Sequence, residues 1–392
     1  MNPSNRAHAC RCSPLGRTVS GGWLVCALVV ATLATGAVHA EDSATSRPAP
    51  EVSEQALLAT LGANFDVRRT PHFVVAYDGD VESLQVFISR LEATYRSVIG
   101  FLRVCDISYK EPVERLEVVF FARYREFHAF AARQGTDSTG MAGFYDRAQN
   151  RAFFYDAVTA PRLDDVKQRI DTLIETLRRR SLSGTAHENA VRELSQLRVR
   201  RDQIIDLINR LVVQHEVAHQ VLFNTGVHVS GADNPTWLVE GLACLFETPP
   251  TDYGAGLAVA NPYRLLNFRE ALVGSDDERA VRAASVEDFR RAVAAGRLGS
   301  IRELVTRRAL FDTATATVEN IYAEAWALTF YLQRQRRDDL AVYLTVIARR
   351  PGDRRYSPEQ EWLLFEETFG PVDEAFERQW VEYILRHRVR TQ

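Results

Sequence analysis

The sequence predicts an α+β protein dominated by helices, with a small mixed sheet in its N-terminal part and a helical C-terminal part. Short runs rich in β-branched and aromatic residues, bounded by turn residues, lie between residues 70 and 156. Apolar residues at helical spacing follow for most of the remaining chain. The 46% hydrophobic and 25% charged composition is typical of a globular protein, and 392 residues are enough to bury a core.

The first 40 residues have the order of a secretory signal peptide. Three arginines and no acidic residue are combined with an apolar run over 23–37, and small residues at 38–40 precede Glu41. The run is shorter than the about 20 residues that a membrane-spanning helix needs. We therefore expect a secreted or periplasmic protein. An uncleaved N-terminal anchor is the alternative, and a lipoprotein anchor at Cys26 is disfavoured because the apolar run continues beyond it.

Removal of this segment would change the formal net charge from −3 to −6, because it carries three basic and no acidic residues. An acidic protein of this kind is not expected to bind nucleic acid. Three of the five cysteines would leave with the segment, so that Cys105 and Cys244 remain. One disulfide between them is possible in an oxidising compartment, but two cysteines are too few for a disulfide framework.

The remaining chain divides into a lead-in and one domain. Residues 41–69 are expected to form a tether and lead-in, of which 41–54 has a disordered composition. The domain is expected over residues 70–385. Its predicted sheet elements are strands at 73–77 and 116–121 and a hairpin with strands at 144–145 and 152–155, and its first predicted helices are at 82–102 and 125–133.

Residues 162–203 predict an inserted helical hairpin, with its break at 181–185. One apolar stripe runs along both arms, and packing of the two helices on each other is favoured over a partner-binding face. Residues 204–250 then predict two helices joined by a turn, and the pattern from residue 286 to the end is again helical.

The two helices at 204–250 carry the residues most indicative of chemistry. His215-Glu216-Val217-Ala218-His219 is an HExxH sequence, and four residues of helix bring both imidazoles to one face. Glu216 is rotated away from that face and is placed to address a water molecule. Glu240 follows on the second helix as a third ligand. Two histidines, one glutamate and a water form a catalytic zinc set with one open position, so we predict one Zn²⁺ per chain.

HExxH followed downstream by Trp237-Leu238-Val239-Glu240-Gly241-Leu242-Ala243 resembles the gluzincin, or peptidase-MA-like, zinc metallopeptidases. These include thermolysin-like enzymes and zinc aminopeptidases. The flanking sequences HFVVAY at 72–77, GFYD at 143–146 and YAEAWAL at 322–328 resemble more closely an uncharacterised bacterial family of secreted peptidase-MA-like domains. The resemblance covers residues 70–385. It implies a thermolysin-like zincin fold and hydrolysis of peptide bonds.

Neighbouring classes of zinc protein are excluded by spacing. A metzincin has a third histidine six residues after the second, where this chain has Thr225, and His228 lies too far along. A deformylase-type site takes a cysteine upstream of HExxH; here Cys105 is distant and Cys244 is downstream.

The resemblance also implies roles for single residues. Glu216 is the general base toward metal-activated water. Tyr322 is the proposed stabiliser of the oxyanion, with His228 as its rival, and packing of Tyr322 in a helix interface is the alternative. Either 143–145 or 152–155 is a candidate edge strand for an extended peptide, although an ordinary hairpin explains them equally well.

Two departures from the resembled families narrow the prediction. Thermolysin-like enzymes carry an aspartate behind a zinc histidine where this chain has Cys244, and Glu247 is a possible substitute. The glutamate with which zinc aminopeptidases hold a free amino terminus is missing, which favours an endopeptidase acting on a peptide or protein. The alternatives are a catalytically inactive, zinc-stabilised extracytoplasmic binding module and a hydrolase of non-peptide amides or esters.

Overall fold

A computed structural model describes residues 50–388 except 63, 140, 180–181, 249–258, 309–310, 312–315 and 353. The predicted signal peptide at 1–40 lies outside the described residues. Within the described part of the chain, no helix has both the length and the apolar character needed to cross a bilayer.

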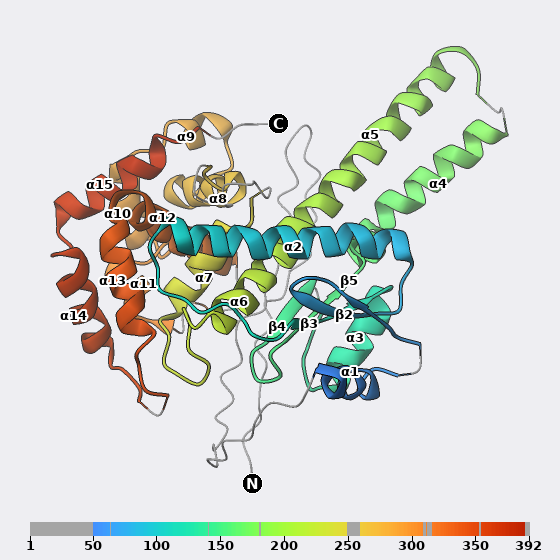
Figure 1. The fold of residues 1–392 in the computed structure, drawn as a ribbon. Helices are drawn as coiled ribbons and strands as arrows, with labels where there is room; N and C mark the ends of the chain where they lie inside the picture. Colours follow the sequence, from blue (N-terminus) through green and yellow to red (C-terminus); the bar gives the residue numbers. More distant parts are fainter. Residues whose placement is uncertain are drawn as a thin grey trace, which may run out of the picture.

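The N-terminal part is a mixed five-stranded sheet with helices against it (Figure 1). The strand order is β1-β2-β3-β5-β4; the central pairs β2–β3 and β3–β5 are parallel, and both outer pairs are antiparallel. The elements of this part are α1 (Pro50–Ala59), β1 (Asp66–Arg69), β2 (Phe73–Tyr77), α2 (Val81–Val104), β3 (Leu116–Phe121), α3 (Tyr124–Arg133), β4 (Gly143–Asp146) and β5 (Arg151–Tyr155).

The predicted class, a helix-dominated α+β protein with a small mixed sheet, is confirmed, and the strands predicted at 73–77 and 116–121 have those bounds. Two elements of the N-terminal part were not predicted. Helix α1 begins at Pro50, inside the segment expected to be a disordered tether. Strand β1 has the polar sequence Asp-Val-Arg-Arg, and it forms by pairing with β2, Asp66 opposite Tyr77. Such a strand lacks the apolar alternation on which sequence prediction depends.

Helix α2 joins the sheet to the helical part of the molecule. Asp80 caps its first turn by accepting hydrogen bonds from the backbone N–H groups of Glu82 and Ser83. Leu84, Leu91 and Val98 recur along one face and are buried. The helix runs from the sheet past α6 and α7 toward the C-terminal helices (Figure 1).

Two helices project from this body. α4 (Asp164–Arg178) and α5 (Gly184–Ile208) lie side by side and extend away from the rest of the molecule (Figure 1). They are joined by a bidentate ion pair between Arg169 and Glu193, and Ile170 is buried between them. Val191, part of the predicted apolar stripe, stays 47% exposed, so the packing of the pair uses only part of the stripe.

The C-terminal part is helical and covers the side of α6 and α7 away from the sheet (Figure 1). Its helices are α8 (Pro262–Val273), α9 (Glu278–Arg282), α10 (Val286–Ala294), α11 (Ile301–Thr306), α12 (Ala316–Gln335), α13 (Arg337–Ile347), α14 (Pro358–Phe369) and α15 (Glu374–Leu385). Cys105 and Cys244 are both buried free thiols, so the disulfide left open by the sequence does not form.

Candidate metal centre

Helix α6 (His215–Asn224) places the two histidines of HExxH side by side. One helical turn separates His215 from His219, which puts both side chains on the same face. Their Nε2 atoms are 2.9 Å apart, and both rings are buried. Two imidazole nitrogens directed at one point provide half of a four-coordinate metal site.

Helix α7 (Thr236–Leu245) supplies a third donor atom. Glu240 Oε2 lies 3.2 Å from Nε2 of His215 and 3.3 Å from Nε2 of His219. Ligands about 2.05 Å from a tetrahedral ion are separated by roughly 3.3 Å, so the spacing suits a metal of this size. The structure therefore brings the three predicted ligands into one buried group that could hold a metal ion.

Glu240 reaches this position because α7 packs very closely on α12. The next residue, Gly241, faces α12, and a Cβ atom there would lie 2.7 Å from the carbonyl oxygen of Ala325 and would also meet the hydroxyl of Thr329. A separation under 3 Å is closer than carbon and oxygen normally approach, so only glycine permits this contact. The sequence Glu240-Gly241 thus combines a candidate ligand with the close packing that positions it.

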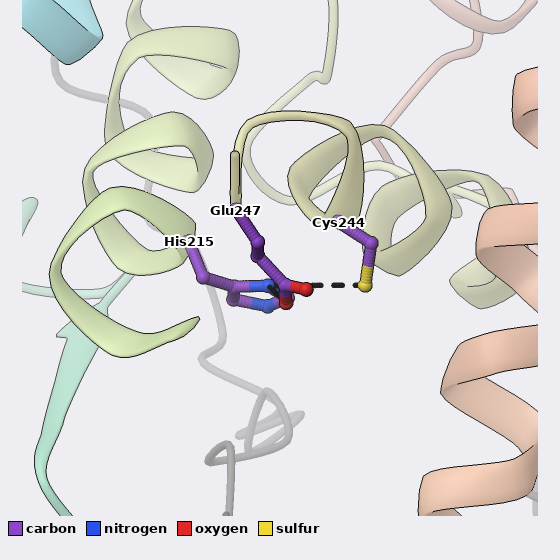
Figure 2. Close-up of side chains that lie close together, drawn as sticks. All are labelled: His215, Cys244 and Glu247. Carbon is purple, nitrogen blue, oxygen red and sulfur yellow. Dashed lines mark hydrogen bonds and ion pairs between the residues drawn. The ribbon is translucent and has the colours of Figure 1, made fainter. Parts of the chain in front are cut away.

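The other nitrogen of His215 faces a second carboxylate. Its Nδ1 lies 2.9 Å from Glu247 Oε1 (Figure 2). A neutral His215 that donates Nδ1–H to Glu247 carries its lone pair on Nε2, the atom that faces His219 and Glu240. This is the usual arrangement behind a metal-binding histidine, in which a carboxylate sets the tautomer and the ring orientation.

Glu247 is itself held by a buried cation. Arg264 donates Nε–H to Oε2 at 2.7 Å and Nη2–H to Oε1 at 2.6 Å, and Asn261 donates to Oε2 at 2.8 Å. Burial would raise the pKa of Glu247, but the charges of Arg264 and His215 and their hydrogen bonds lower it to about 2. Glu247 is therefore an ionised group with its hydrogen-bonding capacity in use. The sequence indicated Glu247 as a possible substitute in this role, whereas Arg264 and Asn261 were not singled out.

His215, Cys244 and Glu247 form a second group close enough to hold an ion. The sulfur of Cys244 lies 4.0 Å from His215 Nδ1, and burial raises the pKa of the thiol to about 11, so the thiolate that would bind a metal is disfavoured. In the first group, by contrast, Glu240 Oε1 has no hydrogen-bond partner among the described residues. Unpartnered buried carboxylate oxygens are uncommon, and a carboxylate that binds a metal ion would account for this one. The first group is the better metal site.

We expect a Cys244→Ala variant to retain as much zinc as wild type after dialysis, because its sulfur is not a donor in the first group. A Glu240→Gln variant should lose the metal, because an amide replaces the anionic ligand. Elemental analysis of both variants checks this choice. If Cys244→Ala lost zinc and Glu240→Gln retained it, the metal would instead be assigned to the group of His215, Cys244 and Glu247.

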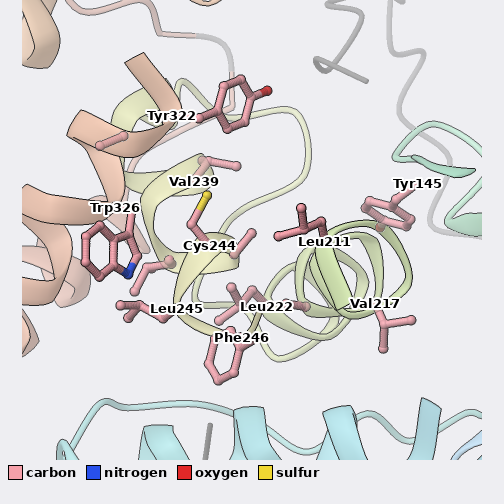
Figure 3. Close-up of a cluster of buried hydrophobic side chains, with 14 of the residues drawn as sticks. Tyr145, Leu211, Val217, Leu222, Val239, Cys244, Leu245, Phe246, Tyr322 and Trp326 are labelled. Carbon is pink, nitrogen blue, oxygen red and sulfur yellow. The ribbon is translucent and has the colours of Figure 1, made fainter. Parts of the chain in front are cut away.

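Apolar side chains of the same helices form a buried cluster (Figure 3). Leu211 and Leu222 come from the η3–α6 segment, and Val239 and Phe246 come from α7 and its end; all four are buried. Because this cluster excludes water, charges beside it interact strongly. Burial would raise the pKa of Glu240, for example, but His219 and His215 lower it to about 2.

Glu216 lies beside the ligands and faces the sheet. Its Oε2 accepts a hydrogen bond of 2.9 Å from the backbone N–H of Tyr145 on β4, while Oε1 has no hydrogen-bond partner among the described residues. Burial is the main cause that raises the pKa of Glu216 to about 8, and the negative charge of Glu240 adds to it. The charge of His215 acts in the opposite direction. β4 is the outer strand of the sheet, whereas β5 is interior, so of the two predicted edge strands only β4 is one.

Two further predicted residues face this group. Tyr322 of α12 has its ring centroid 6.1 Å from that of His215, and its hydroxyl has no partner. Burial and the charge of Glu240 raise the pKa of Tyr322, which keeps the hydroxyl protonated as a donor. His228 is also buried, and neither ring nitrogen has a partner. Burial lowers its pKa to about 3, with a further contribution from His219, so it is neutral.

The sequence analysis did not predict the π-helical turn and the glutamine that position the start of α6. The six residues before it, η3 (Asn209–Gln214), form a π-helical turn, a feature frequent at functional sites. The last of them, Gln214, donates to the carbonyl oxygens of Phe246 at 2.5 Å and Thr248 at 2.6 Å, and accepts a hydrogen bond from Arg90 of α2. Gln214 therefore ties α6 to the end of α7. A polar residue inside an apolar run was the only signal for it.

The comparisons with known proteins add one finding. Residues 210–352 match the family described as a protein of unknown function (DUF1570). The match begins within η3, next to the metal centre, and extends past α13, so it includes His215, His219, Glu240 and Tyr322. It spans less than half of the chain and leaves out the sheet. Neither the search of curated proteins nor that of solved structures gave a match.

Proposed function

We propose that the protein is a zinc-dependent hydrolase that cleaves peptide bonds, with a thermolysin-like zincin fold of the gluzincin type. The observation that carries the proposal is the combination of two buried groups. Three donor atoms converge within 3.3 Å of one another, and the carboxylate of Glu216 lies beside them with one oxygen unpartnered. A purely structural metal site has no use for Glu216, whereas hydrolysis needs a base at this position.

His215, His219 and Glu240 would hold the metal, and a bound zinc ion supplies Lewis acidity toward a carbonyl oxygen and toward water. Glu216 accepts the proton of the attacking water through Oε1, while the N–H of Tyr145 holds Oε2. Tyr322 offers its hydroxyl as the hydrogen-bond donor to the oxyanion. The outer edge of β4, on which the N–H of Tyr145 already holds Glu216, offers further backbone groups along which an extended peptide can lie once the site opens.

A second candidate function, a catalytically inactive, zinc-stabilised binding module, is favoured by the burial of the site. His215, Glu216, His219, Glu240 and Tyr322 are each at most 2% exposed. Turnover on a peptide therefore presupposes an opening that exposes these groups. A catalytically inactive, zinc-stabilised binding module needs no such opening. The unpartnered Glu216 oxygen and Tyr322 hydroxyl favour the enzyme, because a structural site would leave neither group unsatisfied.

The signal-like N-terminus supports a secreted or periplasmic place of action. The proposed substrate is a peptide or protein. The sequence lacks the glutamate with which zinc aminopeptidases hold a free amino terminus, and this supports endopeptidase action.

Incubation of the purified protein with a peptide library, followed by mass spectrometry, tests the proposal. We expect internal cleavage that is abolished by a zinc chelator and restored by added Zn²⁺. Zinc-loaded protein that cleaves no library peptide would contradict the peptidase proposal and favour the binding module.

A further inference from the structure

Arg147 is not paired with a carboxylate in the part of the chain that the structure describes. It follows β4 in the turn to β5 and is half-buried, with its guanidinium carbon 5.5 Å from the centroid of the Phe223 ring. Among the described residues it has neither a hydrogen bond nor an ion pair. Partial removal of an unpaired guanidinium from water costs free energy, and a bound anion would offset this cost.

The place of Arg147 ties it to the metal centre. Phe223, under the guanidinium, lies one helical turn after His219, and its ring centroid is 5.2 Å from that of His228 and 6.0 Å from that of Tyr145. Tyr145 is the residue whose N–H holds Glu216. Arg147 follows two residues later, as the first residue of the turn after β4, which corresponds to at most roughly 7 Å of chain. It therefore lies at the border of the site, within reach of a peptide aligned with β4.

The surroundings of Arg147 are positively charged as well. Its pKa is lowered mainly by burial and also by the charges of Arg355 and Arg308. These two arginines share one carboxylate, that of Asp233, to which Arg355 is bound at 3.1 Å. A third arginine, Arg350, is paired with Glu361 through two hydrogen bonds, of 2.7 and 2.8 Å. Three arginines thus share two carboxylates near Arg147, which is itself unpaired among the described residues, and such an excess of positive charge attracts anionic ligands.

We propose that Arg147 binds a substrate carboxylate within about two residues of the bond to be cleaved, and so selects acidic peptides. The planar guanidinium donates two parallel N–H groups, a geometry that matches a carboxylate. The carboxylate belongs either to an acidic side chain or to the C-terminus of the substrate. This inference rests on the proposed function, because it assumes that a peptide lies along β4.

Binding to the Glu216→Gln protein tests the inference without turnover. Fluorescence anisotropy would compare labelled peptides that differ only in Glu or Gln at one position, and a second pair that differs only in a free or amidated C-terminus. We expect the carboxylate member of one pair to bind roughly 10- to 100-fold more tightly, as charge-assisted hydrogen bonds allow. The pair that shows the difference identifies the source of the carboxylate. The preference should disappear when Arg147→Gln is added and persist in part with Arg147→Lys.

Arg133→Gln is the matched control. Arg133 also lies over an aromatic ring, 5.7 Å from the centroid of Phe130, but on α3, away from the metal centre. This control should keep the full preference. Equal binding within both pairs, or a preference that survives Arg147→Gln, would overturn the inference. Cleavage by wild type without an acidic preference would also overturn it while leaving the proposed function intact. A preference in binding without any cleavage would instead contradict the proposed function alone.

Discussion

A Glu216→Gln variant should bind zinc and melt like wild type but hydrolyse its best peptide at least roughly 10²–10⁴-fold more slowly, the usual contribution of general base catalysis. The amide keeps the size of the side chain, and its oxygen can still accept the N–H of Tyr145. It has no basic oxygen to take a proton at the position of Oε1. Because Glu216 is not among the three converging ligands, metal content should not change. Steady-state kinetics together with zinc analysis and thermal melting measure the three quantities.

Glu324→Gln provides the matched control for this variant. Glu324 is likewise fully buried, accepts one backbone N–H, from Gly299 at 2.9 Å, and has a second oxygen without a partner. It lies outside the metal centre, so its replacement should leave kcat/KM unchanged. Turnover by Glu216→Gln at the wild-type rate would refute the proposed mechanism and favour the zinc-stabilised binding module.

Replacement of Tyr322 by Phe should lower kcat by about 10²–10³-fold, the effect of removing one donor to an oxyanion. The ring would stay in contact with Phe311, whose centroid is 5.7 Å away, so packing and zinc content should be preserved. KM should change little, because the hydrogen bond forms with the transition state and not with the bound substrate. Measurement of kcat and KM separately distinguishes this role from a defect in binding.

Tyr343→Phe is the corresponding control, since Tyr343 of α13 is also buried with an unpartnered hydroxyl, and it packs on Trp237 away from the ligands. It should keep wild-type kcat. A full loss of kcat in His228→Asn, with none in Tyr322→Phe, would assign the oxyanion donor to His228 instead.

The grouping of the three candidate ligands could be predicted because the evidence for it is local. The four-residue spacing of His215 and His219 determines a shared face once the segment is helical. Glu240 required only a second helix after a turn. The sheet was recognisable for the same reason: β2 is a continuous apolar run and β3 is one interrupted only by Glu117, as expected of interior parallel strands.

The groups around the ligands could not be predicted, because their partners are distant in sequence. Arg264 lies 17 residues from the carboxylate that it binds, and Arg90 lies 124 residues from Gln214. Nothing in the pattern of either segment indicates the contact. Arg147 was indistinguishable in the sequence from the many other arginines, since what distinguishes it is that no described residue pairs with it in the fold. Polar networks are set by tertiary packing, which a single sequence does not display.

Zinc stoichiometry is the most direct test of the metal centre. The three-ligand site predicts about one zinc per chain in purified protein after extensive dialysis, measured by elemental analysis. His219→Ala should be nearly free of zinc, because it leaves two protein ligands, while its circular dichroism should still show a helical protein. Full zinc occupancy in His219→Ala would contradict the site proposed here, and so would wild-type protein that binds no zinc.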